Sequence, residues 1–369
     1  MKNVAIISEY NPFHNGHAYQ IKLLREQGFS TVIAIMSGNV TQRGELAFAD
    51  KYKRAEAAVR AGVDLVLELP VPYNFSSSEF FAYGGVFAAD RIGVDALSFG
   101  SESGDIELLD KHGFGETAAK AGVGAASAEF AHSGLGSNDI LGTAYLRALK
   151  KLASPVTPIT HKRIGDAFLS DTPESEFASA TAIRALFANG KIKETEKYMP
   201  REAFLTLVDS ANKYADEERE NRYSAVLLST FLLSDAEELS SFAELSGGLA
   251  SRMKRMAERA TSAYELFSLS ATKVYTNGRI RRAALCALTR TPFSALREDP
   301  EYLTLLAANR KGREYLSSGR INIPVCSSVR EKKQYKSFAY ESRVDSLWSL
   351  VKGERTSDAY GRKPFILDN

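Results

Sequence analysis

Two histidines, His14 and His17, follow an apolar run at the start of the chain. The run 4–10 leads into Asn-Pro-Phe-His-Asn-Gly-His, which places both histidines between a predicted strand and a predicted helix. Their ring N–H groups can donate hydrogen bonds to phosphate oxygens that gain charge when an α-phosphorus is attacked. Gly16 allows the backbone to approach a nucleotide closely. Ordinary loop histidines can show this spacing too, but the position after a strand favours nucleotidyl transfer, with His14 and His17 stabilising its transition state.

Further polar residues follow the next predicted strands. The loop 36–45 contains Ser37, Asn39, Gln42 and Arg43. A Glu-Leu-Pro turn at 68–70 and a Gly-Ser-Glu-Ser turn that begins at Gly100 come after the two strands that follow. Each could be a plain turn, because Gly, Ser, Asn and Pro are turn formers. Together they predict a pocket, since binding residues gather where such loops converge.

A candidate phosphate clamp lies further along the chain. Lys162 and Arg163 follow a predicted strand, and Ser179 and Thr181 open a predicted helix with Arg184 one turn later. Hydroxyls, amides at a helix N-terminus and a guanidinium together suit phosphate oxygens. An N-capping serine with an exposed arginine explains the same residues equally well.

Strands and helices alternate through the first half of the chain. Apolar β-rich runs predict strands at 3–9, 31–36, 64–69, 96–99 and 156–161, and helical periodicity predicts helices at 15–26, 50–61 and 78–91. This alternation predicts an α/β fold with a Rossmann-like, doubly wound parallel sheet and right-handed crossovers. Such folds bind ligands at the carboxyl ends of their strands, where the polar loops lie.

Beyond residue 190 the sequence is mainly helical. Predicted helices span 192–198, 201–207, 223–233, 248–260, 262–269 and 279–288, and one more strand is predicted at 321–325. We therefore expect two domains, a nucleotide-binding catalytic domain at 1–190 and a mainly α-helical, basic domain at 191–369. A chain of 369 residues is long enough for both.

The positive charge of the chain is concentrated toward its C-terminus. The net charge is only +2, but residues 250–369 contain 23 Lys and Arg against 12 Asp and Glu. The C-terminal third is therefore a candidate surface for RNA, although a solvated helical face shows the same excess. The candidate RNA contacts in this part are Lys273, Arg279, Arg281, Arg282, Lys332 and Lys333.

The remaining composition is ordinary for a globular protein, with 44% hydrophobic and 25% charged residues. No stretch approaches the roughly 18 uncharged apolar residues of a membrane span, and the N-terminus enters a strand directly, unlike a signal peptide. We expect a cytoplasmic protein that contacts no membrane. Cys286 and Cys326 lack metal-ligand spacing, so neither a zinc site nor a disulfide is expected.

Several motifs occur in a fixed order along the chain. His-x-Gly-His is followed by Ser-Gly-Asn-x-x-Gln-Arg-Gly-Glu at 37–45, Glu-Leu-Pro at 68–70, Phe-Gly-Ser-Glu at 99–102, Asn-x-Ile-Leu-Gly at 138–142 and Ser-Ala-Thr-Ala-Ile-Arg at 179–184. With these motifs the chain resembles the bacterial tRNA(Met) cytidine acetate ligases of the nucleotidyltransferase superfamily over nearly its whole length. The loop 37–45 and the Glu-Leu-Pro turn make the resemblance specific, because His-x-Gly-His occurs throughout the superfamily.

The resemblance implies a two-step ligase reaction. Acetate attacks the α-phosphorus of ATP to give acetyl-adenylate, with Mg²⁺ as cofactor. The acetyl group then passes to the N4 amine of the wobble cytidine of elongator tRNA(Met), giving N4-acetylcytidine. The implied partners are acetate and this tRNA, with no DNA and no metal held by protein side chains.

The resemblance also implies where ATP binds. By position in the motifs, the ATP site comprises Ile7, Ser8, Glu9, Tyr10, Asn11, Pro12, Phe13, His14, Asn15, Gly16, His17, Ala18, Tyr19, Gln20, Gly100, Asn138, Arg163, Ser179, Thr181 and Arg184. We expect acetate near Ser37, Asn39, Gln42 and Arg43. Which of Asn138 and Asp139 contacts the nucleotide stays open, as do the oligomeric state, the range of acyl donors, the tRNA docking surface and the general base for the cytidine amine.

Two other functions fit parts of the sequence. A nucleotidyltransferase that condenses a phosphorylated metabolite with ATP or CTP would use the same first half, but it would not need the basic helical half. An RNA-binding protein with an inactive nucleotide domain would keep the basic half, but it would not need the histidines.

Overall fold

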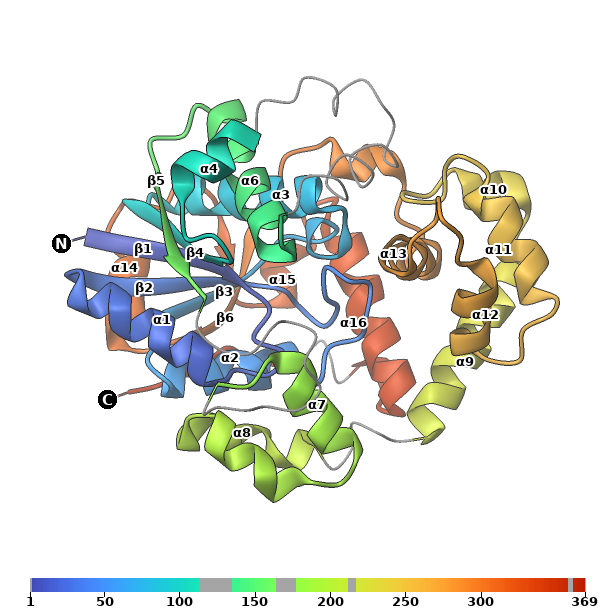
Figure 1. The fold of residues 1–369 in the computed structure, drawn as a ribbon, viewed down its shortest axis with the longest axis horizontal. Helices are drawn as coiled ribbons and strands as arrows, with labels where there is room; N and C mark the ends of the chain where they lie inside the picture. The colour runs from blue at the N-terminus through green and yellow to red at the C-terminus, as the bar shows by residue number, and fades with distance from the viewer. Residues whose placement is uncertain (1, 113–134, 164–176, 212–216, 358–360, 369) are drawn as a thin grey trace.

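One mostly parallel sheet runs through the part of the chain that the computed structural model describes, which is residues 2–112, 135–163, 177–211, 217–357 and 361–368. Its first five strands are β1 (Lys2–Ser8), β2 (Phe29–Met36), β3 (Leu65–Glu68), β4 (Ala96–Ser101) and β5 (Thr157–Lys162). They lie in the order β5-β4-β1-β2-β3 and all pair in parallel (Figure 1). The predicted ends of these five strands lie within two residues of the observed ones, and the predicted α/β fold is confirmed. The strand predicted at 321–325 overlaps the observed strand Val325–Cys326 by one residue only.

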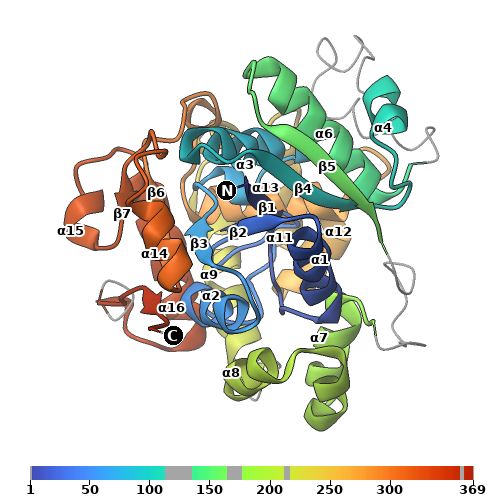
Figure 2. The same cartoon turned by 90° about the vertical axis from the view of Figure 1, so that its left-hand side faces the viewer.

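Helices cover both faces of this sheet. α1 (Asn15–Glu26) and α2 (Lys51–Arg60) lie on one face, and α3 (Ser78–Ile92) and α6 (Ser137–Lys151) lie on the other (Figure 2). On β1, Val4 and Ile6 share a hydrophobic core with α1 and α2, whereas Ala5 and Ile7 share a core with α3 and α6. Successive side chains of a strand point to opposite faces, so a strand that is covered on both sides must be apolar throughout. Two shorter helices here are η1 (Tyr73–Phe75) and α4 (Ile106–His112).

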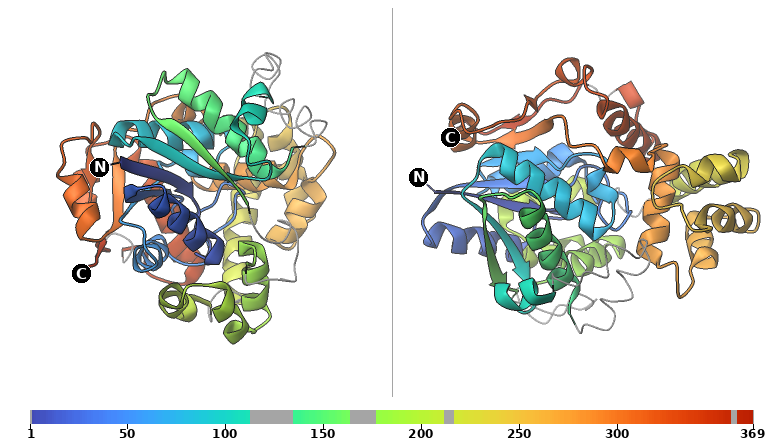
Figure 3. Two further views of the ribbon diagram at one scale, coloured as in Figure 1. Left: turned by 60° about the vertical axis from the view of Figure 1, so that its left-hand side comes forward. Right: turned by 90° about the horizontal axis from the view of Figure 1, so that it is seen from above.

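A group of helices stands to one side of the sheet. We call α9 (Glu217–Leu233), α10 (Ala236–Ser240), α11 (Leu249–Ala257), α12 (Ala263–Ser270) and α13 (Asn277–Leu288) the helical lobe. Seen from above, α9 to α12 stand clear of the sheet (Figure 3). Leu227, Met253, Leu266 and Leu285, one from each of the longer helices, are completely buried in a shared core.

Three further helices precede the helical lobe. α7 (Ala180–Ala188), the 3-10 helix η2 (Ile192–Tyr198) and α8 (Arg201–Ala211) lie on the α2 side of the sheet (Figure 1). Phe204 and Leu207 of α8 share the core that contains Val59 of α2. No helix among the described residues combines enough length and apolar character for a membrane crossing.

After the helical lobe the chain returns to the sheet. β6 (Leu303–Ala308) pairs antiparallel with β3, and β7 (Val325–Cys326) and β8 (Phe365–Ile366) pair in parallel with β6. The helices of this part are η3 (Phe293–Leu296), α14 (Arg310–Leu316), α15 (Val329–Lys332) and α16 (Phe338–Lys352). The predicted division into 1–190 and 191–369 therefore does not describe this last part of the chain. A short apolar run such as that of β6 has no periodicity that separates a strand from a buried helix.

A buried cluster of charges joins the last helices to the sheet. The Nζ atom of Lys51 lies 2.8 Å from Glu68 on β3, and 3.2 Å and 2.9 Å from Glu341 and Asp345 on α16. The Nζ atom of Lys332 lies 2.6 Å from Glu341. Lys332 is buried because it neutralises this carboxylate, so the prediction that it contacts tRNA is wrong.

Candidate active site

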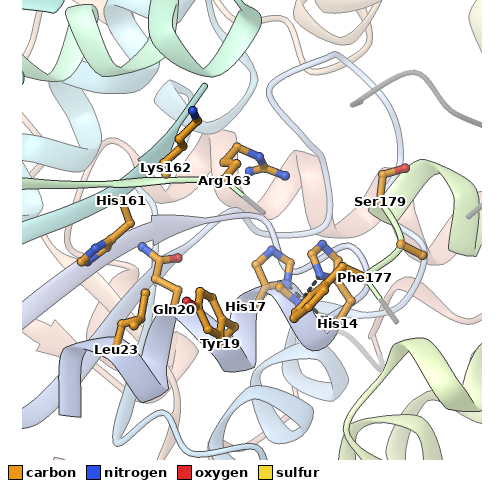
Figure 4. A pocket seen from close by; sticks show the side chains of 13 residues that line it. His14, His17, Tyr19, Gln20, Leu23, His161, Lys162, Arg163, Phe177 and Ser179 are labelled. Carbon is orange, nitrogen blue, oxygen red and sulfur yellow. Dashed lines mark hydrogen bonds between the residues drawn. The ribbon is translucent and has the colours of Figure 1, made fainter. Parts of the chain in front are cut away.

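A cleft with two pockets opens at the carboxyl ends of β1, β4 and β5. Pocket A has a volume of about 100 Å³ and pocket B of about 340 Å³. The residues that line both pockets are His14, His17, Gln20, Gly100, Arg163 and Ser179. Figure 4 shows pocket A, which is also lined by Gly16, Tyr19, Leu23, His161, Lys162, Phe177 and Ala178. The cleft lies where a parallel sheet of this kind binds ligands.

The two histidines are held by the first turn of α1. The Nδ1 atom of His14 accepts a hydrogen bond from the backbone N–H of Gly16 at 3.1 Å, and Nδ1 of His17 accepts one from the backbone N–H of His14 at 3.2 Å. The two rings are stacked, with their centroids 3.8 Å apart. His14 is the N-cap of α1, so these rings supply acceptors that the first N–H groups of a helix otherwise lack.

Both histidine rings are neutral. Burial, together with the charges of Arg163 and Arg184, lowers the pKa of His14 to about 3. Burial is also the main cause that lowers the pKa of His17. A neutral imidazole carries one N–H, and because Nδ1 is the acceptor in each ring, the proton is on Nε2. Each histidine therefore offers one Nε2–H donor, which suits a phosphate oxygen that gains charge.

Gly16 leaves space for the ring of His14. A Cβ atom at this position would lie 2.9 Å from Cε1 of His14, which is too close for two carbon atoms. Any other residue here would displace the capping ring. From the sequence, Gly16 is explained by the close approach of a nucleotide. The structure shows that the ring of His14 already leaves no space for a Cβ atom at this position.

Two cations lie on the β5 side of the cleft. The backbone N–H of Arg163 donates to the carbonyl of Ser101 at 3.0 Å, which fixes Arg163 at the end of the sheet. Its side chain passes over Gly100, where a Cβ atom would lie 3.1 Å from Cγ of Arg163. Lys162 precedes it and lines pocket A (Figure 4). Both side chains are exposed, so their charges are accessible to phosphate groups.

Of the clamp residues Ser179, Thr181 and Arg184, only Ser179 lines the cleft. Ser179 is the N-cap of α7. The Nη1 atom of Arg184 donates to the carbonyl of Asn11 at 2.7 Å, and Nη2 donates to Oγ1 of Thr181 at 3.4 Å. Arg184 and Thr181 thus fix the loop that leads to His14.

Glu102 organises the start of α6. Its carboxylate accepts hydrogen bonds from the backbone N–H and Nδ2 of Asn138, at 3.2 and 2.7 Å, and from the backbone N–H of Asp139 at 2.8 Å. Asn138 lines pocket B, whereas Asp139 is buried and accepts a hydrogen bond from Ser103 at 3.0 Å. Of the two residues, Asn138 is therefore the one that faces the cleft. Glu102 is not identifiable from the sequence except as part of the turn after β4.

The loop after β2 contributes only part of its predicted residues to the cleft. Gln42 and Arg43 line pocket B. Ser37 and Asn39 are buried, and the Asn39 side chain accepts a hydrogen bond from the first N–H of α2 and donates one to Asp345, both at 2.9 Å. The expectation that Ser37 and Asn39 contact acetate is therefore wrong, because they anchor the loop to α2 and α16.

The same loop rests against the helical lobe. Gly44 has a φ of +76°, and a Cβ atom there would collide with the backbone of Arg282 in α13. Glu45 forms an ion pair with Arg281 of α13 and lies 4.0 Å from Arg184. One wall of pocket B is therefore set by the position of α13.

Three of the residues predicted to contact tRNA form hydrogen bonds or ion pairs within the protein. Arg279 is buried and donates to the carbonyls of Glu244 and Ser246, at 3.3 and 2.9 Å. Arg282 lies 3.2 Å from the Glu244 carboxylate, and Arg281 forms the ion pair described above. The prediction for Arg279 is wrong, because its guanidinium holds two turns of the helical lobe together. The predicted contacts that are exposed are Lys273 and Lys333.

Much of the predicted ATP-binding stretch also lines the cleft. Ile7, Ser8, Glu9, Tyr10 and Asn11 line pocket B. Pro12, Phe13, Asn15 and Ala18 line neither pocket. Phe13 instead packs against the ring of His17, with the centroids 5.3 Å apart. The residues of pocket B that the sequence does not single out are Ile6, Ser78, Phe81, Phe99, Ser137, Ile140, Leu141, Tyr145 and Ala180.

Known proteins resemble this chain over its whole length. The family model HIGH Nucleotidyl Transferase matches residues 1–122 and 114–363. A crystal structure of Thermotoga maritima TmcAL superposes with a TM-score of 0.89, at 30% identity over 100% of both chains. A second structure of that protein, bound with alpha-thio ATP, superposes with a TM-score of 0.86 at 29% identity, again over 100% of both chains.

Two relatives by sequence carry the same name, tRNA(Met) cytidine acetate ligase. The protein of Caldanaerobacter subterraneus is 36% identical, and the match covers 93% of this chain and 92% of the relative. The protein of Bacillus subtilis is 30% identical, and the match covers 100% of this chain and 98% of the relative. The chain therefore belongs to the tRNA(Met) cytidine acetate ligase family of the HIGH nucleotidyl transferases.

Proposed function

We propose that this chain activates acetate with ATP and transfers the acetyl group to the N4 amine of the wobble cytidine in elongator tRNA(Met). The observation that carries the proposal is the pair of Nε2–H donors of His14 and His17 in a cleft at the ends of the strands. The family supports the same reaction, since the relatives are named for this tRNA, for cytidine and for acetate. The reaction takes place where tRNA is used, in the cytoplasm.

The first step joins acetate to AMP. An acetate oxygen forms a bond to the α-phosphorus of ATP while the bond from that phosphorus to the leaving pyrophosphate breaks. Negative charge grows on the phosphate oxygens, and the Nε2–H groups of His14 and His17 stabilise it. Arg163 and Lys162 are placed to offset the charge of the phosphates.

The two pockets suit different parts of this chemistry. In pocket A, Tyr19 and Phe177 lie edge to face with centroids 5.9 Å apart, and Leu23 lies beside them (Figure 4). Such apolar and aromatic side chains fit the adenine base. Pocket B then receives acetate and the cytidine, with Gln42 and Arg43 at its wall.

Mg²⁺ belongs to this proposal only as a companion of ATP. Among the described residues there is no group of three or more His, Cys, Asp or Glu side chains arranged to hold a metal. Mg²⁺ is commonly held mainly by substrate phosphates and water, and in that form it would neutralise charge on the triphosphate.

Mass spectrometry of methionine tRNA tests the function directly. The tRNA is incubated with protein, ATP and isotopically labelled acetate, and the anticodon nucleosides are analysed. We expect the label on N4 of the wobble cytidine. Acetate-dependent exchange of pyrophosphate with ATP tests the first step alone, whereas exchange that requires a phosphomonoester would instead identify a small-molecule nucleotidyltransferase.

A further inference from the structure

Acetyl transfer to cytidine requires a group that accepts a proton. The N4 amine attacks the acetyl carbonyl carbon, a C–N bond forms, and the bond from that carbon to the AMP oxygen breaks with its electrons leaving on AMP. The nitrogen must lose one proton to become a neutral amide. The N4 lone pair is conjugated with the pyrimidine ring, so a base that removes the proton during the attack assists the reaction.

The histidines of the cleft are not suited to this role. In each ring Nδ1 already accepts a backbone N–H, and Nε2 carries the proton. Their pKa values lie below the ordinary range for histidine because the rings are buried, so they take up a proton only in acid. Another group must act as the base.

Glu9 is the one carboxylate among the described residues that line pocket B. Its Oε1 atom accepts a hydrogen bond from the backbone N–H of Gln42 at 2.8 Å, which fixes the side chain. Among the described residues no donor is found for Oε2, and this atom is not one of the enclosed polar atoms. Oε2 therefore faces the space of the pocket, where it can accept a proton.

The surroundings of Glu9 set its basicity. Burial raises the pKa of Glu9, whereas the hydrogen bond from Gln42 and the charges of Arg184 and Arg43 lower it, and Glu45 raises it again. Burial is the largest of these effects. Arg54 and Tyr145 also lie beside Glu9. Arg54 donates a hydrogen bond to the backbone carbonyl of Glu9, and burial keeps the phenol of Tyr145 protonated by raising its pKa. A carboxylate with a raised pKa is a stronger base than one in water.

We propose that Glu9 is the general base of the acetyl-transfer step and that its Oε2 accepts the proton from N4 of the cytidine. The proposal rests on the proposed function of the cleft. After AMP leaves, the protonated carboxyl returns its proton to water. The hydrogen bond from the backbone N–H of Gln42 keeps the Glu9 side chain in position for the next turnover.

The substitution Glu9→Gln tests this role, because the amide oxygen of glutamine can still accept the hydrogen bond from Gln42. We expect transfer of labelled acetyl to tRNA to fall by about 10²–10⁴-fold, the usual contribution of a general base. Acetate-dependent pyrophosphate exchange should fall far less. Transfer by the unsubstituted protein should decline as the pH drops through the pKa of Glu9, and Glu9→Gln should lose that decline. Glu9→Asp should keep it at a lower rate.

Glu79→Gln is the matched control. Glu79 is exposed on the first turn of α3, next to Ser78 of pocket B, but it does not line that pocket. Its substitution removes the same charge and should leave both steps unchanged. Equal loss of exchange and transfer in Glu9→Gln, or transfer that keeps its pH dependence, would overturn the proposal. Absence of acetate-dependent exchange in the unsubstituted protein would instead refute the proposed function.

Discussion

At the scale of single residues, the chemistry of the site depends on which nitrogen of each histidine is used by the backbone. Because Nδ1 of His14 and His17 completes the first turn of α1, the fold itself fixes Nε2–H as the donor. The same contacts exclude both rings as bases at neutral pH. Structure and catalysis therefore use opposite sides of the same ring.

The substitution His14→Asn should separate these two uses. Asparagine is a good N-cap and its side-chain oxygen can replace Nδ1, but it has no group that reaches the place of Nε2. We expect the free energy of unfolding to change by less than about 1 kcal/mol. Acetate-dependent pyrophosphate exchange should fall about 10²–10³-fold, the usual cost of removing one such donor. An unchanged exchange rate would show that His14 has only a structural role.

The stability of the protein should fall in mild acid. His14 has a pKa of about 3 in the folded protein against the ordinary 6.5, so below pH 6.5 the unfolded chain binds a proton that the folded chain does not. Each pH unit below 6.5 then lowers the free energy of unfolding by up to about 1.4 kcal/mol for this histidine. Urea denaturation at pH 7 and pH 5 measures the effect. His14→Asn should show a smaller loss between these two pH values, and an equal loss would contradict the assignment.

Some residues of the site can be identified from the sequence because their signals are local. His14, Gly16 and His17 act on one another within a single turn, so their spacing carries most of the information. The predictions that Lys332 and Arg279 contact tRNA are wrong because the sequence shows the charge of a residue directly but does not show whether the residue is buried. Their environments depend on Glu341 and Glu244, and Glu244 lies 35 residues from Arg279.

At the scale of elements, the buried charge cluster fixes α16 against α2 and β3. Lys51 meets three carboxylates there, and its side chain is only 1% exposed. Breaking one member of such a cluster leaves charges buried without a partner, which is costly. The cluster also holds Asn39 through Asp345, so it reaches the loop that forms a wall of pocket B.

The substitution Lys51→Met should therefore lower the free energy of unfolding by about 3–5 kcal/mol. Lys53→Met in the same helix is the matched control, because Lys53 is 56% exposed and pairs with Glu56 at the surface. A surface pair of this kind contributes less than about 1 kcal/mol. Equilibrium urea denaturation of both variants makes the comparison, and equal midpoints would refute the role given to Lys51.

At the scale of the whole molecule, the sheet provides the cleft and the helical lobe supports it from the side. The lobe contacts the cleft through the loop that contains Gly44 and Glu45. The excess of Lys and Arg toward the C-terminus remains a candidate for tRNA binding. Several of these side chains, however, form hydrogen bonds or ion pairs within the helical lobe. The exposed Lys273 is therefore a better test of RNA contact than the arginines of α13.

The substitution Lys273→Ala should weaken tRNA binding without affecting pyrophosphate exchange. Loss of one phosphate contact should reduce the slope of log binding constant against log salt concentration by about 1. Lys311→Ala is the control, since Lys311 is an exposed lysine of α14, outside the helical lobe. Binding measured by filter retention at several salt concentrations checks both variants. Equal salt slopes in Lys273→Ala and the unsubstituted protein would exclude a phosphate contact at Lys273.

Much of the fold was predictable, since the strands and helices around the cleft have clear periodicity. The exceptions lie in the last part of the chain, where the sequence pattern predicts neither the helices α14 to α16 nor β6, whose pairing with β3 spans most of the chain. Such a pairing depends on two segments that lie far apart in the sequence, and the residue pattern of either segment alone does not predict it. The two-domain prediction placed the boundary where helices begin, but it could not detect the return to the sheet.

The pairing of β3 with β6 also has a consequence for synthesis on the ribosome. β3 ends at Glu68 and β6 begins at Leu303, about 235 residues later. At roughly 5–20 residues per second, the edge of β3 waits about 10–50 s for its partner. An open strand edge of a nascent chain can pair with other chains during that time. The edge of β3 in the growing chain is therefore open to such pairing until β6 has been made.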